Sequence, residues 1–180
     1  MRVIAGSARG VPLVAPRGTK TRPITDRVKE TLFGILGDRV PDARVLDLYA
    51  GSGAIGIEAL SRGAEHADFV EHDRAALAAL ERNLERTRLG NVASVHAADV
   101  ERFLRSPHGG PWDLVVLDPP YETRAIVAPL RALARHLAPG ASVVVKHFWR
   151  SEVPEVEGLA VVRQRRFGET MLTFLEGPDA

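Results

Sequence analysis

The sequence predicts a doubly wound α/β fold built on a mostly parallel, seven-stranded, Rossmann-like sheet. Short apolar runs alternate five times with helical segments along the chain. The first run leads into a glycine-rich loop at residues 51–56, and the last two are joined only by residues 167–169. Alternating strands and helices are typical of a parallel sheet, whereas such a short turn requires a C-terminal antiparallel hairpin. Ligands of these folds bind at the carboxyl ends of the strands.

An N-terminal extension is expected at residues 1–37, ahead of a main domain at residues 38–180. Two extended runs in it, residues 2–5 and 11–14, flank a glycine-containing turn and predict a small β-hairpin. Pro12 has no N–H to donate to a ladder, so the second run would lie at an edge.

A loop and a helix complete this extension. Residues 15–23 contain prolines, a glycine and basic side chains, a composition typical of a loop. Thr25 or Asp26 can cap a helix that continues to about Leu36, with Gly37 just beyond its end.

The main domain contains the alternating elements. Gly63 stands where a glycine often closes a helix, and Asp73 can cap the following long helix. The expected strands are residues 43–49, 67–71, 93–97, 112–117, 141–146, about 159–166 and 170–176. The expected helices run from the glycine loop to about residue 62, over 74–88, around 100–105 and over 124–137.

Composition narrows the class of protein. The 180 residues are 45% hydrophobic and 26% charged, which is ordinary for one globular protein. There is no cysteine, which excludes disulfides and thiolate metal sites, and the six histidines show no paired ligand spacing, so we expect no metal. No apolar run approaches the roughly 20 residues of a membrane span, and no signal peptide is evident. We expect a cytoplasmic monomer without a membrane association.

Charge is distributed unevenly along the chain. Residues 1–30 contain seven basic and two acidic residues, a net charge of +5, which leaves −4 for the other 150 residues. A basic arm on a slightly acidic body suggests that a polyanion meets one end of the molecule. The basic side chains expected to contact it are Arg9, Arg17, Lys20, Arg22, Arg27 and Lys29.

The glycine loop leaves two cofactor classes open at first. Residues 51–56 match the dinucleotide fingerprint, and Glu71 lies twenty residues past Gly51, where a ribose-binding acid belongs. This pattern alone favours a nicotinamide enzyme. However, Asp47 at the end of the first strand would repel a pyrophosphate, and Asp99 after the third strand can accept from an adenine amino group. Together these acids favour S-adenosylmethionine, which has a cationic tail and no phosphate.

Each acid also has a plain structural interpretation. Asp47 can simply bond the amides of the loop, Glu71 and Asp99 can be strand-end or turn residues, and Asp73 is assigned to helix capping. The residues expected to bind the cofactor are Asp47, Ala50, Gly51, Ser52, Gly53, Glu71, His72, Asp99 and Val100.

The tetrapeptide Asp118-Pro119-Pro120-Tyr121 follows the buried fourth strand and is the expected catalytic segment. Two prolines forbid helix and ladder pairing, which leaves the neighbouring carbonyls without internal partners. A carboxylate, a free carbonyl and an aromatic ring can together grip a flat group that carries an amine. The alternative is an ordinary surface turn.

Several residues near the C-terminus have open roles. Lys146 and His147 end the fifth strand and can approach the same cleft, but a structural or RNA-facing role suits His147 better than a catalytic one. Phe148 and Trp149 are expected to form wall or core. The arginines of residues 163–166 either touch phosphate or form a charged edge that discourages aggregation.

The chain resembles a known family in these motifs. Residues 46–53, Leu-Asp-Leu-Tyr-Ala-Gly-Ser-Gly, with the tetrapeptide at 118–121, resemble class I S-adenosylmethionine-dependent N-methyltransferases. Residues 2–6, 22–33 and 51–62 are more specifically similar to the bacterial 16S ribosomal RNA guanine-N2 methyltransferases of the RsmD type. The resemblance extends from residue 2 to about residue 175. Ile24 departs from it, at a position where a polar residue is common.

This resemblance implies a reaction and a partner. The expected activity is methyl transfer from S-adenosylmethionine to the exocyclic N2 amine of one guanine in 16S rRNA, leaving S-adenosylhomocysteine. The substrate would be the small ribosomal subunit or an assembly intermediate. The resemblance places Gly51 and Gly53 against the cofactor, Glu71 on its ribose, Asp99 near its adenine and residues 118–121 around the base.

Other functions stay open at this point. The tetrapeptide suits any planar exocyclic amine, so another amine in RNA or DNA is an alternative target. A nicotinamide-dependent oxidoreductase is favoured only by the glycine loop and Glu71. A non-catalytic RNA-binding assembly factor would tolerate a broken glycine loop or tetrapeptide, and here both are intact.

Overall fold

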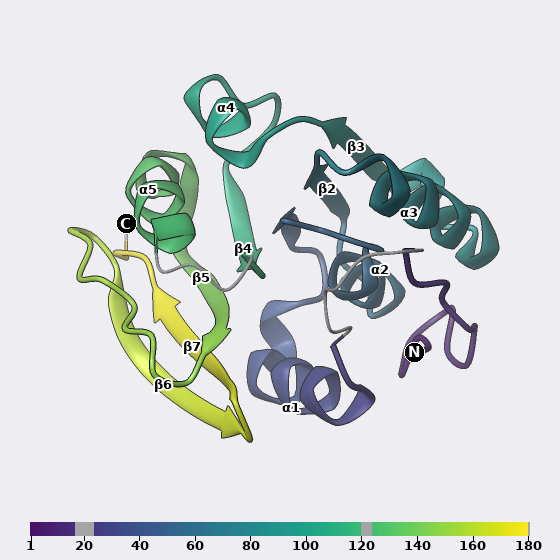
Figure 1. Cartoon of the computed structure of the whole chain (residues 1–180), viewed down its shortest axis with the longest axis horizontal. Helices are drawn as coiled ribbons and strands as arrows, with labels where there is room; N and C mark the ends of the chain where they lie inside the picture. The colour runs from purple at the N-terminus through teal and green to yellow at the C-terminus, as the bar shows by residue number, and fades with distance from the viewer. Residues whose placement is uncertain (17–23, 120–123, 180) are drawn as a thin grey trace.

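The computed structural model describes residues 1–16, 24–119 and 124–179, and it confirms the predicted fold class. One seven-stranded sheet has the order β3-β2-β1-β4-β5-β7-β6, parallel from β3 to β5 and antiparallel in its last two pairs (Figure 1). The strands are β1 Arg44–Leu48, β2 His66–Glu71, β3 Ala93–Ala97, β4 Trp112–Leu117, β5 Leu137–Phe148, β6 Ala160–Phe167 and β7 Thr170–Glu176. The helices are α1 Asp26–Leu36, α2 Ala54–Ser61, α3 Arg74–Thr87, α4 Val100–Arg105 and α5 Arg124–Leu133.

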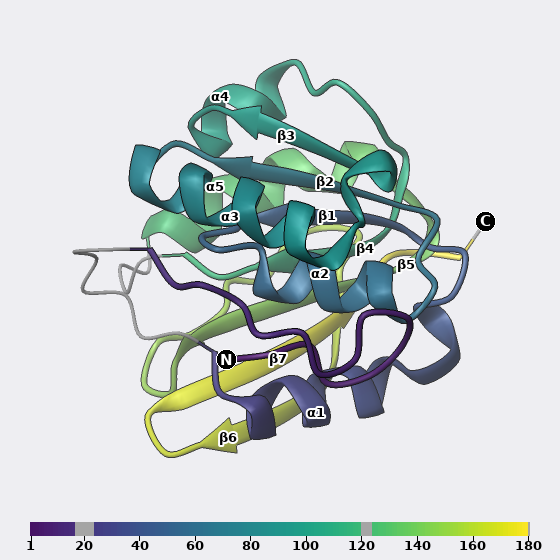
Figure 2. The same ribbon diagram turned by 90° about the vertical axis from the view of Figure 1, so that its right-hand side faces the viewer.

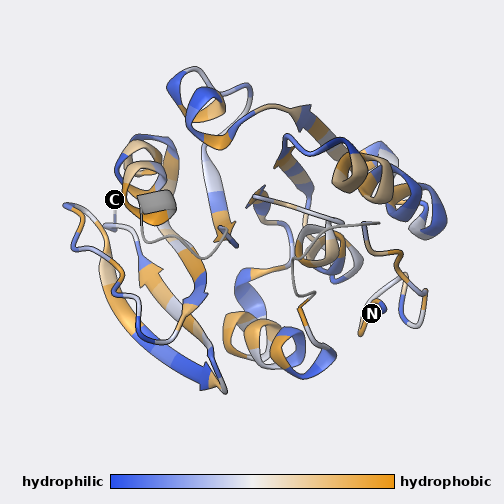
Figure 3. Cartoon of the chain, in the orientation of Figure 1, coloured by the Kyte–Doolittle hydropathy of each residue, from blue (hydrophilic) through white to orange (hydrophobic). Residues whose placement is uncertain are grey.

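Two apolar layers enclose the sheet. One core cluster joins α1, α2 and α3 to one face, and a second joins α4 and α5 to the other face. The strands in the middle are apolar on both faces, because each face is covered (Figure 3). The largest side chain without solvent exposure is Trp112, at the start of β4.

The order of the strands reverses between β1 and β4. From β1 the chain moves outward through β2 and β3, then returns to pair β4 with the other side of β1. Leu48 is in register with Leu117, and Asp118 N donates to the Leu48 carbonyl at 3.3 Å. The carboxyl ends of β1 and β4 therefore lie side by side, at the switch point where folds of this type bind ligands (Figure 2).

Local capping signals in the sequence are confirmed. The Thr25 side chain accepts from Val28 N at the start of α1, and Asp73 accepts from Ala76 N at the start of α3. Most expected boundaries agree with the structure to within two residues.

The fifth strand is longer than the expected 141–146 and begins at Leu137. Trp112 of β4 pairs with Leu137 of β5, whereas Leu114 pairs with Ser142. The register of the two strands therefore shifts between these pairs, and residues 138–140 of β5 form the irregular stretch. The preceding helix correspondingly ends at Leu133, followed by a short 3₁₀ turn.

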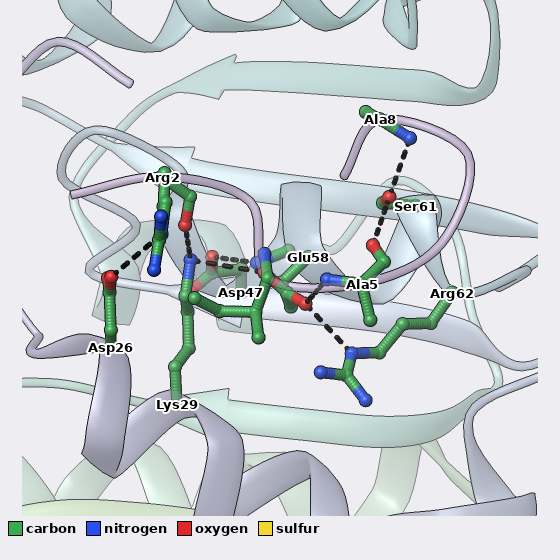
Figure 4. A network of polar contacts seen from close by, with 11 residues as sticks. Arg2, Ala5, Ala8, Asp26, Lys29, Asp47, Glu58, Ser61 and Arg62 are labelled. Atoms are coloured by element: carbon green, nitrogen blue, oxygen red, sulfur yellow. Dashed lines mark hydrogen bonds and ion pairs between the residues drawn. The ribbon is translucent and has the colours of Figure 1, made fainter. Parts of the chain in front are cut away.

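The N-terminal segment is fastened to α2 by side chains (Figure 4). The expected hairpin is present but short: Arg2 and Pro12 form an antiparallel bridge, Val3 N donates to the Val11 carbonyl at 3.0 Å, and Leu13 N donates to the Met1 carbonyl at 3.1 Å. Backbone N–H groups of Ile4 and Ala5 donate to the two oxygens of Glu58 at 2.8 and 3.0 Å, which uses donors that a longer ladder would need.

Lys29 completes this attachment, which corrects its assignment to RNA. Its side chain is fully buried, its Nζ lies 3.1 Å from Glu58, and it donates to the Arg2 carbonyl at 2.5 Å. Glu58 is equally buried and also pairs with Arg62 at 2.9 Å. Lys29 therefore has a structural role in the interior of the protein.

No helix in residues 1–16, 24–119 and 124–179 is long and apolar enough to cross a bilayer. The same ranges contain no cluster of three or more His, Cys, Asp or Glu side chains that could hold a metal ion.

The buried ion pair predicts a large difference between two neighbouring cations of α1. Lys29→Met should lower the free energy of unfolding by about 3 kcal/mol, because it leaves a buried carboxylate short of its cation. Arg27→Gln, at an exposed position, should change it by less than about 0.5 kcal/mol. Urea denaturation of both variants measures the difference. Equal stabilities would contradict the structural role of Lys29.

Candidate active site

Asp118 leaves the end of β4 and meets Lys146 from the neighbouring strand β5. Lys146 Nζ donates to Oδ1 at 2.6 Å and to Oδ2 at 2.9 Å. The side chains are 28% and 12% exposed, so the pair lies at the rim of the sheet rather than in its core. Burial raises the pKa of Asp118, while the charge and hydrogen bond of Lys146 act in the opposite direction.

Lys146 adds a cation that the tetrapeptide alone does not contain. A carboxylate has about four lone-pair sites, so Asp118 can accept from Lys146 and from a substrate amine together. Lys146 fixes the carboxylate in one orientation. In the sequence, the one indication of this role is that Lys146 lies at the end of the expected fifth strand, from which it can approach the same cleft as Asp118.

The glycine loop turns directly beside this pair. Gly51 and Gly53 have φ of 56° and 75°, and Tyr49 before them has φ of 60°. A left-handed conformation is rare for a tyrosine and tends to occur at functional sites. Tyr49 is half-buried against the α4–α5 core, and burial, with Asp99 and Glu101 nearby, raises its pKa to about 12. Nothing in the local sequence pattern indicated this residue.

The three fingerprint glycines have different roles. A Cβ atom at Gly56 would lie 2.3 Å from Cε1 of the Phe69 ring, and one at Gly53 would lie 2.2 Å from Leu80 Cδ1. Both glycines therefore allow α2 to pack closely on β2 and α3. A Cβ at Gly51 would meet only the Tyr49 carbonyl, at 4.0 Å. Gly51 is thus the glycine whose side faces open space.

Asp47 and Glu71 hold the loop from beneath. Asp47 is 1% exposed and accepts from Gly56 N at 2.9 Å, which agrees with the loop-orienting alternative for this residue. Glu71 accepts from the N–H groups of Gly51, His72 and Asp73 at 2.8 to 2.9 Å. The pKa of Asp47 is raised to about 8, chiefly by burial. The Asp118 and Glu71 carboxylates contribute to this rise, and the hydrogen bond from Gly56 opposes it.

The other expected cofactor residues lie around the same strand ends. Asp99 caps α4 by accepting from Arg102 N at 3.1 Å, so one of its oxygens has a structural role. Val100 is buried, His72 is exposed with its Nδ1 3.7 Å from Glu71, and Ala50 is half-buried. β1, β2 and β3 are adjacent and parallel, so their ends bring these residues to one edge.

Asn83 of α3 links this loop to the N-terminal segment. Its fully buried amide accepts from Val14 N at 2.8 Å and donates to the carbonyls of Val14 and Ser52 at 3.0 and 2.9 Å. Ser52, expected at the cofactor, is thereby fixed through its backbone. An asparagine within an amphipathic helix gives no sequence signal for such a link.

The three described residues among those expected at RNA have different environments. Arg27 is exposed in the first turn of α1, whereas Arg9 belongs to a turn held by Ser61 at the end of α2, about 12 Å of helix away from the glycine loop. Lys29 is buried, as described above. The remaining expected site residues, Arg17, Lys20, Arg22, Pro120 and Tyr121, lie outside the described residues.

His147 has a structural environment. It is 6% exposed, its Nε2 lies 2.8 Å from Thr173 Oγ1, and its Nδ1 lies 2.9 Å from the Phe148 carbonyl. Burial lowers its pKa. Both ring nitrogens therefore have partners inside the sheet rather than in the cleft.

Comparison with known proteins identifies the family. The family model described as Conserved hypothetical protein 95 matches residues 1–176. YlbH of Bacillus subtilis, a putative rRNA methyltransferase, is 40% identical over 175 residues, 94% of this chain and 95% of that protein. Ribosomal RNA small subunit methyltransferase D of Escherichia coli is 44% identical over 121 residues, 67% of this chain and 60% of that protein. The chain belongs to the RsmD-type methyltransferase family.

A solved structure agrees with this assignment. The putative methyltransferase yhhF of Escherichia coli matches with a TM-score of 0.89 and 34% identity, over 100% of this chain and 99% of that one. The described part of the chain therefore shares this fold, including the N-terminal segment that packs on α2.

The buried acid beneath the loop of this RsmD-type protein predicts a pH dependence of stability. The pKa of Asp47 is about 8 in the folded protein, whereas the ordinary pKa of an aspartate is 3.8. Between these values the folded state binds more protons than the unfolded state, so stability falls as pH rises, by up to about 1.4 kcal/mol per unit from this group.

Asp47→Asn should flatten that fall, because an amide oxygen can still accept from Gly56 and never ionises. Urea denaturation at several pH values between about 4 and 8 measures the slope, with exposed Asp38→Asn as the matched control. A slope in the Asp47 variant equal to that of the control would show that Asp47 does not titrate in this range.

Proposed function

We propose that this protein transfers a methyl group from S-adenosylmethionine to the exocyclic N2 amine of a guanine in 16S rRNA. The observation that carries the proposal is the position of Asp118, which Lys146 holds at the switch point of the sheet, next to the end of the strand that leads into the glycine loop. A relative is named as a methyltransferase of small-subunit ribosomal RNA, which supports the substrate class.

The charge of the site supports this cofactor. Asp47, Glu71 and Asp118 surround the loop closely enough for the last two to raise the pKa of the first. Because a pKa of about 8 leaves Asp47 mostly protonated at neutral pH, the negative potential comes from the Glu71 and Asp118 carboxylates. It disfavours the pyrophosphate of a dinucleotide and favours a sulfonium and an ammonium group. Gly51 offers the open side against which the cofactor would lie, and Glu71 and Asp99 lie at the strand ends where its ribose and adenine would bind. The cofactor would supply the electrophilic methyl group.

The protein would make a poor nucleophile reactive by orienting it. The lone pair of a guanine amine is delocalised into the ring, so the nitrogen must become pyramidal before it can attack. The Asp118 carboxylate and the Pro119 carbonyl would accept hydrogen bonds from the two N–H groups of the amine. These hydrogen bonds favour the pyramidal geometry and stabilise the positive charge that develops on nitrogen. Lys146 would keep the carboxylate in place. The proton would leave to Asp118 or to solvent.

The wider partner is part of the same proposal. We propose that residues 1–37 form an RNA-binding extension of a methyltransferase domain at 38–180, and that a cytoplasmic monomer acts on the small subunit or an assembly intermediate. Exposed Arg27, at the start of α1, supports this role. Residues 1–13 and α1 share a core cluster with α2, so the extension is anchored against the helix that begins at the glycine loop.

Removing the charge of Asp118 tests the chemistry. Asp118→Asn should reduce the turnover number by about 100-fold, equivalent to roughly 3 kcal/mol, because one preorganised acceptor becomes neutral. Affinity for S-adenosylmethionine should be nearly unchanged. Asp113→Asn is the matched control at the other end of β4, where the side chain accepts from Arg44 N.

The assay identifies the product as well as the rate. Methyl-labelled S-adenosylmethionine is incubated with unmodified small subunits, with naked 16S rRNA and with DNA, and the labelled nucleoside is identified by mass spectrometry. N2-methylguanosine from subunits or rRNA is the expected product. A different labelled nucleoside would move the target to another exocyclic amine, and NADH binding without affinity for S-adenosylhomocysteine would establish an oxidoreductase instead.

Two glycine variants separate cofactor binding from folding. Gly51→Ala places a methyl group in open space, so cofactor affinity should fall at least tenfold while stability falls by only about 1 kcal/mol, from the left-handed φ. Gly56→Ala forces a methyl group onto the Phe69 ring and should cost about 1–3 kcal/mol of stability. Calorimetric titration and urea denaturation measure the two effects. An unchanged cofactor affinity of Gly51→Ala would show that the cofactor does not bind against this face of the loop.

A further inference from the structure

Trp149 follows the end of β5, and its ring contacts the guanidinium groups of two arginines. The guanidinium carbon of Arg166 lies 3.7 Å from the centre of the Trp149 ring, and that of Arg150 lies 4.7 Å from it. Trp149 N donates to the Glu169 carbonyl at 2.9 Å, which continues the β5–β7 pairing one step beyond the strand. Arg166 Nε also donates to the Gly168 carbonyl at 2.8 Å. The indole and both guanidinium groups are thereby held at the tip of the hairpin.

This cluster lies on the same edge of the sheet as Asp118. β6 is antiparallel to β7, which is antiparallel to β5, so β6 runs in the direction of the parallel strands. Its last residues therefore reach the edge where β4 ends. Arg165 is in register with Leu172, which is in register with Lys146. Three strand spacings of about 4.8 Å separate β4 from β6, a distance of roughly 14 Å.

The arginines of this edge have no acidic partner in the described part of the chain. None of Arg150, Arg163, Arg165 and Arg166 takes part in an ion pair there. All four are exposed, and the second half of β6 is correspondingly hydrophilic (Figure 3). Two like charges near one ring repel each other, and an anion bound close to both would relieve that repulsion.

Protection of an edge strand does not account for the geometry. Scattered charges suffice to discourage aggregation, and they need no aromatic support. A guanidinium stacked on an indole is instead restricted in orientation, so it loses less freedom when it binds the oxygens of a phosphate. Two guanidinium groups already lie over the Trp149 ring, which suits the cluster to phosphate rather than to a stacked base.

We propose that Arg150, Trp149 and Arg166 form a phosphate-binding site for the RNA strand that carries the target base. This inference rests on the proposed function, because RNA is preferred to an acidic protein only where the target base must enter at Asp118. The backbone of unpaired nucleotides next to that base crosses the ends of β5 and β6. The basic arm of residues 1–30 and this cluster then contact the RNA at two separate places.

The test compares two pairs of arginines on opposite edges of the sheet. Arg150→Gln combined with Arg166→Gln should weaken binding of unmodified 16S rRNA about tenfold or more, because two charge-assisted contacts are lost. The slope of log Kd against log salt concentration should fall by about 1.4, at about 0.7 for each lost contact to a single strand. Arg131→Gln combined with Arg135→Gln removes equal charge from exposed positions just before β5 begins, and should leave both values near wild type.

A third variant separates the stacking from the charge. Trp149→Leu keeps both arginines, so its salt slope should equal that of the wild type while its Kd rises about threefold through the lost cation–π contacts. Titration with S-adenosylmethionine verifies that each variant keeps a folded cofactor site.

The outcomes distinguish this inference from the proposed function. If the wild type methylates rRNA and the Arg150 and Arg166 variant retains the wild-type salt slope, the phosphate site is wrong and the function stands. An equal loss in the control pair would likewise overturn it, since the effect would be one of net charge. If the wild type binds the cofactor but neither binds nor methylates rRNA or unmodified small subunits, the proposed function fails first.

Discussion

The buried carboxylate of Glu58 joins the N-terminal segment, α1 and the sheet into one body. It lies in the middle of α2 without solvent exposure, accepts hydrogen bonds from two backbone N–H groups and from Arg62, and forms an ion pair with Lys29. A buried charge is tolerated only when its desolvation is offset by such partners. The arrangement makes the position of α2 depend on segments that precede the sheet in the sequence. The glycine loop, which begins α2, depends on it in turn.

Close packing beneath the loop has a comparable effect on the site. Gly53 and Gly56 allow α2 to approach β2 and α3, and Asp47 then accepts from Gly56 inside the protein. Burying Asp47 near two other carboxylates is unfavourable in isolation, as its raised pKa indicates. The Glu71 and Asp118 carboxylates that raise this pKa also favour a cationic ligand on the open side of Gly51. Stability is thus lost at a place where the proposed cofactor would gain affinity.

The carboxyl edge of the sheet combines two kinds of charge. Carboxylates gather at the ends of β1, β2 and β4, where a cationic cofactor and an amine are proposed to meet. Arginines without acidic partners in the described residues gather at the end of β6, about 14 Å away across the strands. Lys146 stands between the two regions. In the proposed complex, this separation would keep the phosphates of the RNA away from the acidic loop.

The sequence by itself determined the fold class, the capping residues Thr25 and Asp73, and the glycine loop next to the Asp118 turn, because these depend on periodicity and on the chemistry of adjacent residues. The tertiary structure decided the partners: Lys146 for Asp118, Glu58 for Lys29, and Val14 and Ser52 for Asn83. These pairs are separated by 28 to 69 residues, and strand order and register bring them together. Local sequence patterns do not determine strand register or the packing of helices. The sequence therefore predicted Lys29 to be a surface cation, whereas in the tertiary structure it is buried.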